Sequence, residues 1–339
     1  MATPTSAPVT NGHVSQRSPE DLRLALRAAT LYYLDGLTQA EIAVRLGVSR
    51  PTAGRLVARA RARGLVRIDI VVPPEMRDNL HADEERELEA RFGLTEVVVA
   101  GHGVDTGAPG RPAAFANLGR AAAALLTRRL GPDDVLGFTW GPEQAAVAAA
   151  LMPGVATCRA VVQLDGAMSS AAYQTGVEMI LGRCADMLRA NTIRLPAPLY
   201  ADPSTVMSMR CDSVISRTLE AGRHADVMLF GVGAVSTSTT LFEGSYLDTR
   251  MLDEQIAAGA VGEIGGRFFD EQGAPVDTEL QQRAVSVPLE DIRACEKSML
   301  IASGVAKHRA TLAALRGRLA RLLVCDIDCA RWLLDHGKG

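Results

Sequence analysis

The sequence predicts an α/β protein: an N-terminal helix-turn-helix domain, winged-helix-like in its pattern, followed by a larger Rossmann-like α/β domain. Residues 36–56 carry the capping residues of two short consecutive helices, which is the pattern of a helix-turn-helix. From residue 95 onward, short runs rich in valine and leucine alternate with alanine-rich helical segments. Such alternation is typical of a parallel sheet covered by helices on both faces. The 339 residues are enough for two or three domains.

The helix-turn-helix prediction depends on the residues at the helix ends. Thr38 is expected to cap the first helix, and Glu41 three residues later completes a capping box. Gly47 ends that helix, where the backbone needs a positive φ. Ser49 caps the second helix, and Pro51 is tolerated in its first turn because an N–H there would have no partner. Two helices joined in this way indicate a DNA-binding domain.

The charge of this segment agrees with DNA binding. Between Ile42 and Ile68 there are seven arginines and no acidic residue, a local basic surface that attracts DNA phosphates although the whole chain has a net charge of −3. Helical spacing directs Arg50, Thr52 and Arg55 toward base edges, while later arginines would meet phosphates or solvent. The alternative is a helical hairpin with a solvated arginine face. The candidate DNA-binding residues are Thr38, Gln39, Ser49, Arg50, Thr52, Arg55, Arg59 and Arg61.

The pattern divides the chain into four parts. Residues 1–17, rich in Pro, Ser and Thr, are expected to be a disordered tail, and residues 18–72 are expected to form the helix-turn-helix domain. Residues 73–94 are expected to form a charged linker helix, which joins the domains or pairs with a second subunit. Residues 95–339 then form the second domain.

Two further elements are expected in the helix-turn-helix domain. A first helix opens at Ser18 with a cap, a proline and two acidic residues. A strand at residues 65–72 is a candidate wing. The expected buried stripe of the first helix consists of Leu22, Ala25, Leu26, Ala29 and Tyr33.

Composition gives no sign of a membrane segment or of a cofactor. There is no run of about 18 apolar residues, and nothing at the N-terminus resembles a signal peptide. The six cysteines form no Cys-x-x-Cys pair, which favours reduced, mostly buried thiols in a cytoplasmic protein. The histidines have no spacing typical of a metal site or a catalytic triad. A metal held by Cys325, Asp326 and Cys329 is the alternative for the two neighbouring cysteines.

The second domain places candidate ligand-binding residues where its strands end. In open α/β sheets, ligands bind beyond the carboxyl ends of strands, where loops and helix starts offer backbone N–H groups. The predicted strands are 96–100, 135–139, 160–164, 227–233, 299–303 and 319–326. The predicted helices are 112–130, 142–151, 173–190, 212–223, 305–316 and 327–335. The four strand ends of interest contribute Trp140, Gly141, Glu143, Gln144, Asp165, Gly231, Gly233 and Lys307.

Several motifs, in this order along residues 22–334, resemble those of the SorC family of bacterial transcriptional regulators, sometimes grouped with DeoR-type sugar-responsive repressors. The resemblance implies a second domain with the fold of sugar-phosphate isomerases and aminosugar deaminases, used for sensing an effector. It also implies tetramers, usually dimers of dimers, on palindromic operators. The resembling stretches are residues 37–43, 137–141, 161–166, 229–233, 262–270, 303–307 and 322–334.

Carried over by position, residues 140–143 fall on the loop that usually holds the effector's phosphate, and Glu263 and Lys307 fall on ligand-contacting positions. Family members commonly have Trp-Gly-Arg-Thr in that loop, whereas this chain has Trp-Gly-Pro-Glu. The change removes a cation and a hydroxyl donor and adds a repelling charge. Glu263 also stands where an aspartate is frequent. We therefore expect an unphosphorylated polyol or sugar, with Glu143 accepting hydroxyl hydrogen bonds.

Three of these residues have an alternative role. Lys307, at a helix start, opposes the helix dipole, which a ligand anion or hydroxyl would explain; otherwise it is a solvated lysine. Glu263 bonds sugar hydroxyls, or it caps a turn or forms a salt bridge. Trp140 stacks on a sugar ring, or its indole belongs to the core.

The expected function is that of a cytoplasmic, DNA-binding regulator of a carbohydrate or polyol operon, without enzymatic activity or cofactor. Its expected partners are double-stranded operator DNA, a small sugar or polyol effector and further copies of the chain. One alternative is a sugar-phosphate isomerase or deaminase with a DNA-binding appendage, disfavoured because the cleft loops show no acid/base pair with a nearby histidine. Another is an architectural or sigma-like DNA binder whose large domain only mediates assembly.

Overall fold

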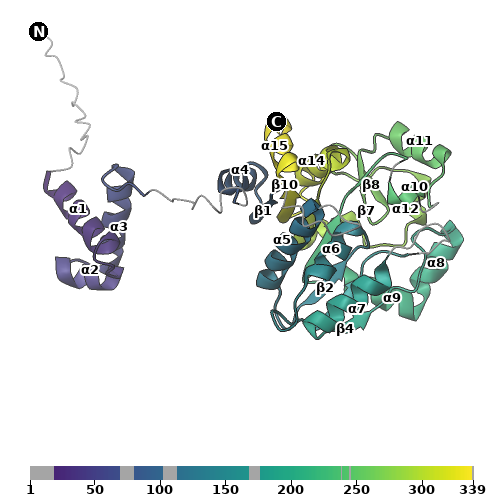
Figure 1. Ribbon diagram of the computed structural model, residues 1–339, viewed down its shortest axis with the longest axis horizontal. Coiled ribbons are helices and arrows are strands. Elements are labelled where there is room, and N and C mark those ends of the chain that lie inside the picture. Colours follow the sequence, from purple (N-terminus) through teal and green to yellow (C-terminus); the bar gives the residue numbers. More distant parts are fainter. Residues whose placement is uncertain are drawn as a thin grey trace, which may run out of the picture. The chain divides into compact units, whose positions relative to one another are not determined.

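The chain folds into two compact units, Met1–Val72 and Pro73–Gly339, each with its own hydrophobic core (Figure 1). The tail expected at residues 1–17 lies outside the residues that the computed structural model describes. The described residues are 19–68, 80–101, 113–167, 176–237, 239–243 and 246–337.

The first unit is a bundle of three helices, α1 Pro19–Tyr33, α2 Gln39–Leu46 and α3 Arg50–Ala62. Its core is built largely from alanines, including Ala25 and Ala53, which let the helix backbones approach closely. Ile42 and Leu56 fill the space between the helices. Small residues at the crossings therefore set the spacing of this bundle.

The predicted helix caps of this unit are confirmed. The Thr38 hydroxyl accepts the N–H of Glu41, and the Glu41 carboxylate in turn accepts the N–H of Thr38. Gly47 has a φ of 64°, in the left-handed region that favours glycine. The Ser49 hydroxyl accepts the N–H of Thr52 at the start of α3. These bonds fix the turn between α2 and α3.

Two expectations for this unit differ from the structure. Leu22 and Leu26 are 36% and 49% exposed, because α1 turns a face of alanines and Leu31 toward the other helices. Only the two alanines of the predicted stripe are fully buried. Residues 65–68 of the predicted wing belong to no strand, and residues 69–72 lie outside the described residues.

A seven-stranded parallel sheet forms the centre of the second unit. The six predicted strands are confirmed with small shifts at their ends, and the short edge strand β4 is an addition. Every residue of β2 and β3 is buried, as expected for strands covered on both faces. In spatial order, the strands are β1 Glu96–Ala100, β10 Leu322–Asp326, β9 Lys297–Ala302, β5 Val227–Gly231, β2 Val135–Phe138, β3 Ala160–Gln163 and β4 Asn191–Ile193.

Helices cover both faces of this sheet (Figure 1). One face packs against α5 Ala113–Arg129, α6 Pro142–Ala150 and α7 Val177–Leu188. The other packs against α4 Ala82–Phe92, α9 Ser213–Arg223, α13 Leu289–Ala294, α14 His308–Arg316 and α15 Ile327–His336. The α5, α6, α7, α9, α14 and α15 helices confirm the six predicted ones. The additional helices are α8 Pro203–Cys211, α10 Thr240–Glu243, α11 Thr249–Ala257, α12 Glu279–Arg283 and the 3₁₀ turn η2 Val305–Lys307.

A second, antiparallel sheet of three strands begins two residues after β5 ends. Its strands are β6 Gly233–Ala234, β7 Gly262–Ile264 and β8 Arg267–Phe269. The β7–β8 hairpin turns through Gly265 and Gly266, which have φ of 55° and 76°. Two consecutive positive φ values are the geometry of a two-residue hairpin turn, for which glycine is favoured.

The charged helix α4 belongs to the second unit and covers the outer edge of β1. Leu88 of this helix is fully buried. Glu85 and Glu89 accept the backbone N–H groups of Val99 and Val97, each at 2.9 Å. These N–H groups lie on the edge of the sheet, where they have no strand partner. The helix expected as a linker is thus fastened to the sheet.

None of the described helices combines the length and the apolar character needed to span a bilayer. All six cysteines are free, and five of them are buried while Cys211 is exposed. Cys325 and Cys329 belong to the core on one face of the sheet. In the described part of the chain, no group of three His, Cys, Asp or Glu residues is placed to hold a metal ion.

The α5–α6 contact generates a stability prediction. A Cβ added at Gly119 of α5 would lie 2.7 Å from the Ala146 carbonyl oxygen of α6, so Gly119→Ala forces the two helices apart. We expect it to lower the free energy of unfolding in urea by about 1–3 kcal/mol. Gly182→Ala in α7 is the matched control, because nothing lies within 4 Å of its added Cβ. It should be neutral or stabilise by up to about 1 kcal/mol. Equal effects of the two substitutions would contradict the close approach.

Candidate functional site

The N-cap and first two turns of α3 carry a linked set of polar and basic side chains. The Ser49 and Thr52 hydroxyl oxygens lie 2.8 Å apart, and the Arg55 guanidinium donates to the Thr52 hydroxyl at 3.2 Å. Arg50 and Arg55 are exposed. The predicted division of α3 into an exposed and a buried face is confirmed. Its buried face consists of Ala53, Leu56, Val57 and Ala60.

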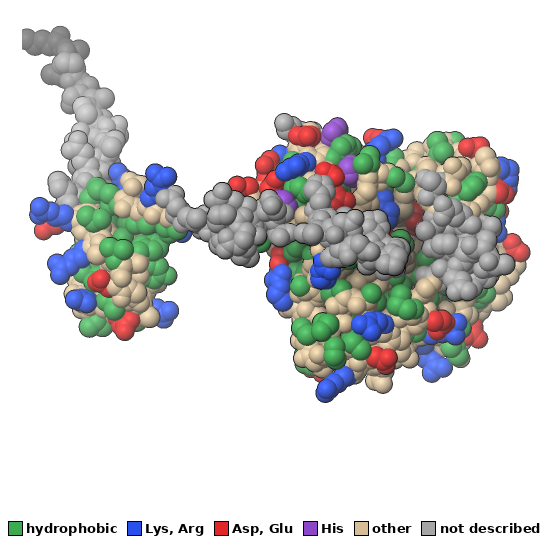
Figure 2. All heavy atoms as spheres, viewed as in Figure 1, with side chains coloured by type: hydrophobic (Ala, Val, Ile, Leu, Met, Phe, Trp, Pro, Cys, Tyr) green, Lys and Arg blue, Asp and Glu red, His purple; other side chains and the backbone are tan. Residues whose placement is uncertain are grey.

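The other candidate DNA-binding residues have different environments. Arg59 lies near α1, with its guanidinium 3.9 Å from the Asp21 carboxylate, whereas Arg61 is exposed. Gln39 lies against Gly54 of α3, where an added Cβ would be 2.9 Å from the Gln39 amide oxygen. Basic side chains are spread over the visible face of this unit (Figure 2).

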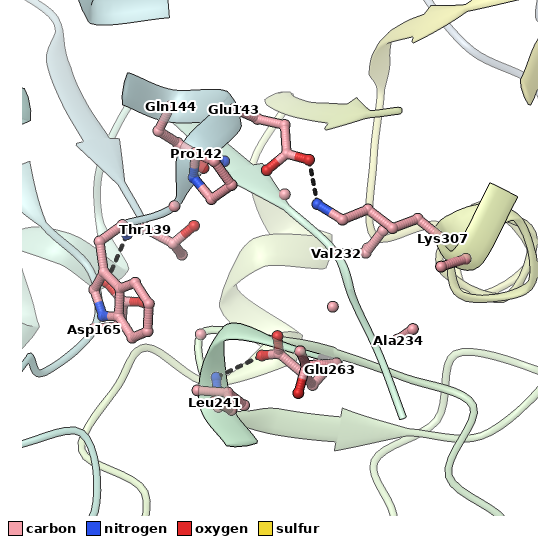
Figure 3. Close-up of a pocket in the computed structure, with 18 of the residues that line it drawn as sticks. Thr139, Pro142, Glu143, Gln144, Asp165, Val232, Ala234, Leu241, Glu263 and Lys307 are labelled. Carbon is pink, nitrogen blue, oxygen red and sulfur yellow. Dashed lines mark hydrogen bonds and ion pairs between the residues drawn. The ribbon is translucent and has the colours of Figure 1, made fainter. Parts of the chain in front are cut away.

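All nine residues expected to bind a ligand line one cavity of about 250 Å³ in the second unit (Figure 3). They come from the segments that follow β2, β3, β5 and β9, and from β7. In the sheet, β2 and β5 are neighbours, but the strand that follows β2 in sequence, β3, lies toward one edge, whereas β9, which follows β5 in this sheet, lies toward the other edge. The connections after β2 and β5 therefore run in opposite directions. Such a topological switch point opens a crevice at the carboxyl edge of a parallel sheet.

Glu143 and Lys307 form an ion pair in this cavity, between the first turn of α6 and the end of η2 (Figure 3). The Glu143 side chain is 3% exposed and that of Lys307 is 23% exposed. Burying a carboxylate without a partner is strongly unfavourable, so Lys307 allows Glu143 to occupy this position. In this structure, the Lys307 amino group is therefore neither free in solvent nor available as an unpaired cation.

Glu263 of β7 joins the cavity to the β7–β8 turn. Its carboxylate accepts the Gly266 N–H at 2.8 Å, which is the turn-capping role considered from the sequence. A Cβ added at Gly233 would lie 2.0 Å from the other carboxylate oxygen, so any larger residue there would displace the Glu263 side chain. Burial raises the pKa of Glu263 from 4.5 to about 7, with the negative charge of Glu143 adding to the effect. The Gly266 N–H and the charge of Lys307 act in the opposite direction.

Asp165 and Trp140 are held together beside the cavity. The Trp140 backbone N–H donates to the Asp165 carboxylate at 3.2 Å, and its indole N–H donates to the Gly166 carbonyl at 2.9 Å. The indole is 8% exposed and packs near Tyr246, so it is a core side chain with one part of its surface on the cavity. Burial raises the pKa of Asp165 well above its usual range. A buried, protonated Asp165 would add no charge to the site.

Gln144 brings a buried donor to the cavity wall. Its side chain is 1% exposed, and its amide nitrogen has no hydrogen-bond partner among the described residues.

The sequence did not identify the lining residues of the small sheet and of α10, because those elements are too short to show a periodic pattern. The lining residues missed from the sequence are Thr139, Pro142, Val232, Ala234, Ser236, Thr239, Leu241, Gly265, Gly266 and Ala306.

Comparison with known proteins covers both units of the chain. Residues 78–335 match a family described as a sugar-binding domain, and residues 29–69 match the MarR family. The crystal structure of the full-length sorbitol operon regulator SorC from Klebsiella pneumoniae is similar, with a TM-score of 0.68 and 27% identity over 93% of this chain and 99% of that chain. The chain belongs to the SorC family.

Two relatives of this SorC-family chain extend over nearly its whole length. The deoxyribonucleoside regulator of Bacillus subtilis strain 168 is 32% identical over 93% of this chain and 98% of its own length. The sorbitol operon regulator of Klebsiella pneumoniae is 29% identical over 93% and 98%, respectively. The chain is thus a transcriptional regulator with a helix-turn-helix domain and a sugar-binding domain. An isomerase or deaminase activity is not supported, because these relatives are regulators.

The buried carboxyl of Glu263 gives this SorC-family regulator a pH-dependent stability. Between about pH 4.5 and pH 7, the folded protein keeps a proton that the unfolded chain has released, so the free energy of unfolding falls as pH rises. The decrease due to Glu263 is about 3 kcal/mol at most. In urea unfolding from pH 5 to pH 8, the free energy of unfolding of Glu263→Gln should vary less with pH than that of the wild type. Relative to the wild type, the variant should be more stable at pH 8 than at pH 5. Parallel curves for the two proteins would contradict the raised pKa.

Proposed function

We propose that this regulator senses an unphosphorylated polyol or sugar in the cavity described above, and the Glu143–Lys307 ion pair carries the proposal. A phosphate ester has close to two negative charges at neutral pH and is held by cations and N–H donors. Among the described residues that line the cavity, Lys307 is the only lysine or arginine. Its charge is already matched by that of Glu143.

The remaining carboxyl groups make the cavity less suitable for a phosphate. Asp165 and Glu263 both line it, and ionisation of either gives the described lining a net negative charge. The backbone at Gly141, which precedes α6, still offers N–H groups, but these bind a neutral hydroxyl oxygen as well. The resemblance to the SorC family implies that arginine and threonine are common in the family where this chain has Pro142 and Glu143.

The polar groups of the cavity suit hydroxyls, which both donate and accept hydrogen bonds. The carboxylates of Glu143 and Glu263 accept, while the Gln144 amide nitrogen donates. Apolar surface from Trp140 and Leu241 is available to C–H groups. The cavity volume of about 250 Å³ is below the roughly 300–1,000 Å³ of pockets for drug-sized ligands, which suits one small carbohydrate.

We also propose how the first unit binds operator DNA. Arg50, Thr52 and Arg55 contact base edges from the first two turns of α3, because the two arginines are exposed and Thr52 is half-buried near the N-terminus, where recognition helices enter the major groove. Arg59 and Arg61 contact phosphates. Thr38, Gln39 and Ser49 position the two helices and offer further polar contacts to the DNA backbone.

The proposed regulator acts in the cytoplasm as a homo-oligomer, as a dimer of dimers on a palindromic operator. Two half-sites require two copies of the helix-turn-helix unit, because each copy reads one half-site. Leu22, Leu26 and Tyr32 of α1 are exposed apolar side chains that suit a contact between copies. Hydrophobic side chains also gather on the visible face of the first unit (Figure 2). Sedimentation equilibrium measures the assembly directly.

The effector proposal is tested by thermal unfolding of the full chain with tetritols, pentitols, hexitols, free sugars and their phosphate esters. A free polyol or sugar should raise the Tm of the wild type, because a ligand of the folded state stabilises it by mass action. Glu143→Gln should weaken that ligand at least about tenfold and permit phosphate esters to bind Lys307. Glu271→Gln is the matched control, since it breaks an exposed Glu–Arg pair outside the cavity. Stabilisation of the wild type by phosphate esters alone, lost in Lys307→Gln, would refute the proposal.

The DNA proposal separates two arginines of α3 by their response to sequence. Arg55→Ala should weaken binding to the operator by about 1–3 kcal/mol, because a base contact is lost. The affinity for the operator should then approach the affinity for random DNA. Arg61→Ala should weaken both DNAs alike and reduce the salt dependence, because a phosphate contact is lost. Fluorescence anisotropy at several salt concentrations measures both effects. Equal losses on the two DNAs for Arg55→Ala would refute its base-reading role.

A further inference from the structure

A second polar cavity, of about 390 Å³, lies between α8, α9 and the segment after α12. It shares no lining residue with the effector cavity. Three of its lining residues are arginines, Arg210, Arg223 and Arg267, and Glu220 is its one acidic lining residue in the described part of the chain. The lining therefore has a positive formal charge, the opposite of the effector cavity.

Arg267 is the most enclosed of the three arginines, and the fold holds it rigidly. Its Nε donates to the Val287 carbonyl at 3.1 Å, and its Nη2 donates to the Ser286 carbonyl at 2.6 Å. Nη1 has no hydrogen-bond partner among the described residues. Burial, together with the nearby charge of Arg210, lowers the pKa of Arg267 to about 10. Nη2 also donates to the Ala284 carbonyl at 3.4 Å, so within the described part of the chain the Nη1 N–H groups of this fixed, desolvated guanidinium are left for an oxyanion.

Two neighbouring groups lack the partners that such a ligand would supply. Ser286 lines the cavity and is 5% exposed, yet its hydroxyl has no hydrogen-bond partner among the described residues. Arg210 is exposed and forms no ion pair within the described part of the chain. Arg223, by contrast, donates to the Asp291 carboxylate at 2.9 Å and is held in place by it. An unpaired buried hydroxyl is costly, and two arginines close together repel each other, so an anion would relieve both conditions.

We propose that this cavity is a second ligand site, which binds a small oxyanion, phosphate or carboxylate, between Arg210, Arg267 and Ser286. Arg267 and Ser286 provide the fixed donors, and Arg210 closes over the anion from the solvent side. The site is independent of the effector cavity, which is proposed to exclude phosphate. A phosphate ester that binds this regulator would then be held here, through its phosphate group.

The test is isothermal titration of the full-length protein with inorganic phosphate, and separately with succinate as the carboxylate probe, at an ionic strength kept constant with chloride. We expect saturable binding of at least one probe, weakened roughly tenfold by Arg210→Gln and by Ser286→Ala. Arg217→Gln is the matched control, because Arg217 is an exposed arginine of α9 that does not line the cavity. It should bind as the wild type does.

Three results would overturn the proposal. The first is the absence of saturable binding of either probe to the wild type. The second is an equal loss in Arg210→Gln and Arg217→Gln, which would indicate general charge screening. The third is binding that survives Arg210→Gln and is lost in Lys307→Gln, which would place the anion in the effector cavity and refute the proposed polyol specificity as well. Binding of a polyol that is unchanged in Arg210→Gln separates the two sites.

Discussion

The common direction of the seven strands is the constraint on which the second domain depends. Because the strands are parallel, their carboxyl ends all lie at one edge, and every connection must return along a face of the sheet. The segments after β2, β3, β5 and β9 therefore converge although they are distant in sequence. Glu143 and Lys307 meet across 164 residues for this reason. The reversal of strand order between β2 and β5 opens the space that their side chains enter.

The Glu143–Lys307 ion pair determines how much free positive charge the cavity offers to a ligand. A carboxylate at position 143 cannot be buried alone, and Lys307 is the cation within reach. The pairing removes from Lys307 the free positive charge that a phosphate would need. The family resemblance along one loop implies that a cation is missing at Pro142, but it does not imply that Glu143 also pairs with a second cation, Lys307. The selectivity proposed above therefore depends on two loops together.

The sequence predicted those elements whose patterns are long enough to repeat. Six strands of the main sheet and six helices were found, as were the caps at Thr38, Gly47 and Ser49, because each depends on local chemistry. The small sheet was missed, since strands of two or three residues have no period to detect. The prediction that Leu22 and Leu26 are buried was wrong, because α1 packs against the other helices through its alanines and Leu31 instead. Neighbouring strand ends identified eight cavity residues and the family resemblance added Glu263, whereas α10 and the hairpin turn contributed residues that only tertiary contact brings there.

A continuous set of packed elements leads from the cavity to the segment that precedes the sheet. Glu143 belongs to α6, which packs closely on α5 at Gly119, and α5 in turn packs on β1. The outer edge of β1 is bonded to Glu85 and Glu89 of α4, the helix of the second domain nearest in sequence to the DNA-binding unit. Regulation requires an effector to prefer one arrangement of the protein over another. Effector hydroxyls that compete for Glu143 or Lys307, as proposed above, would change the contact between α6 and η2, and a densely packed interior would transmit such a change. An effector that prefers one arrangement would therefore act through the position of α4, the element between the main sheet and the DNA-binding unit in sequence.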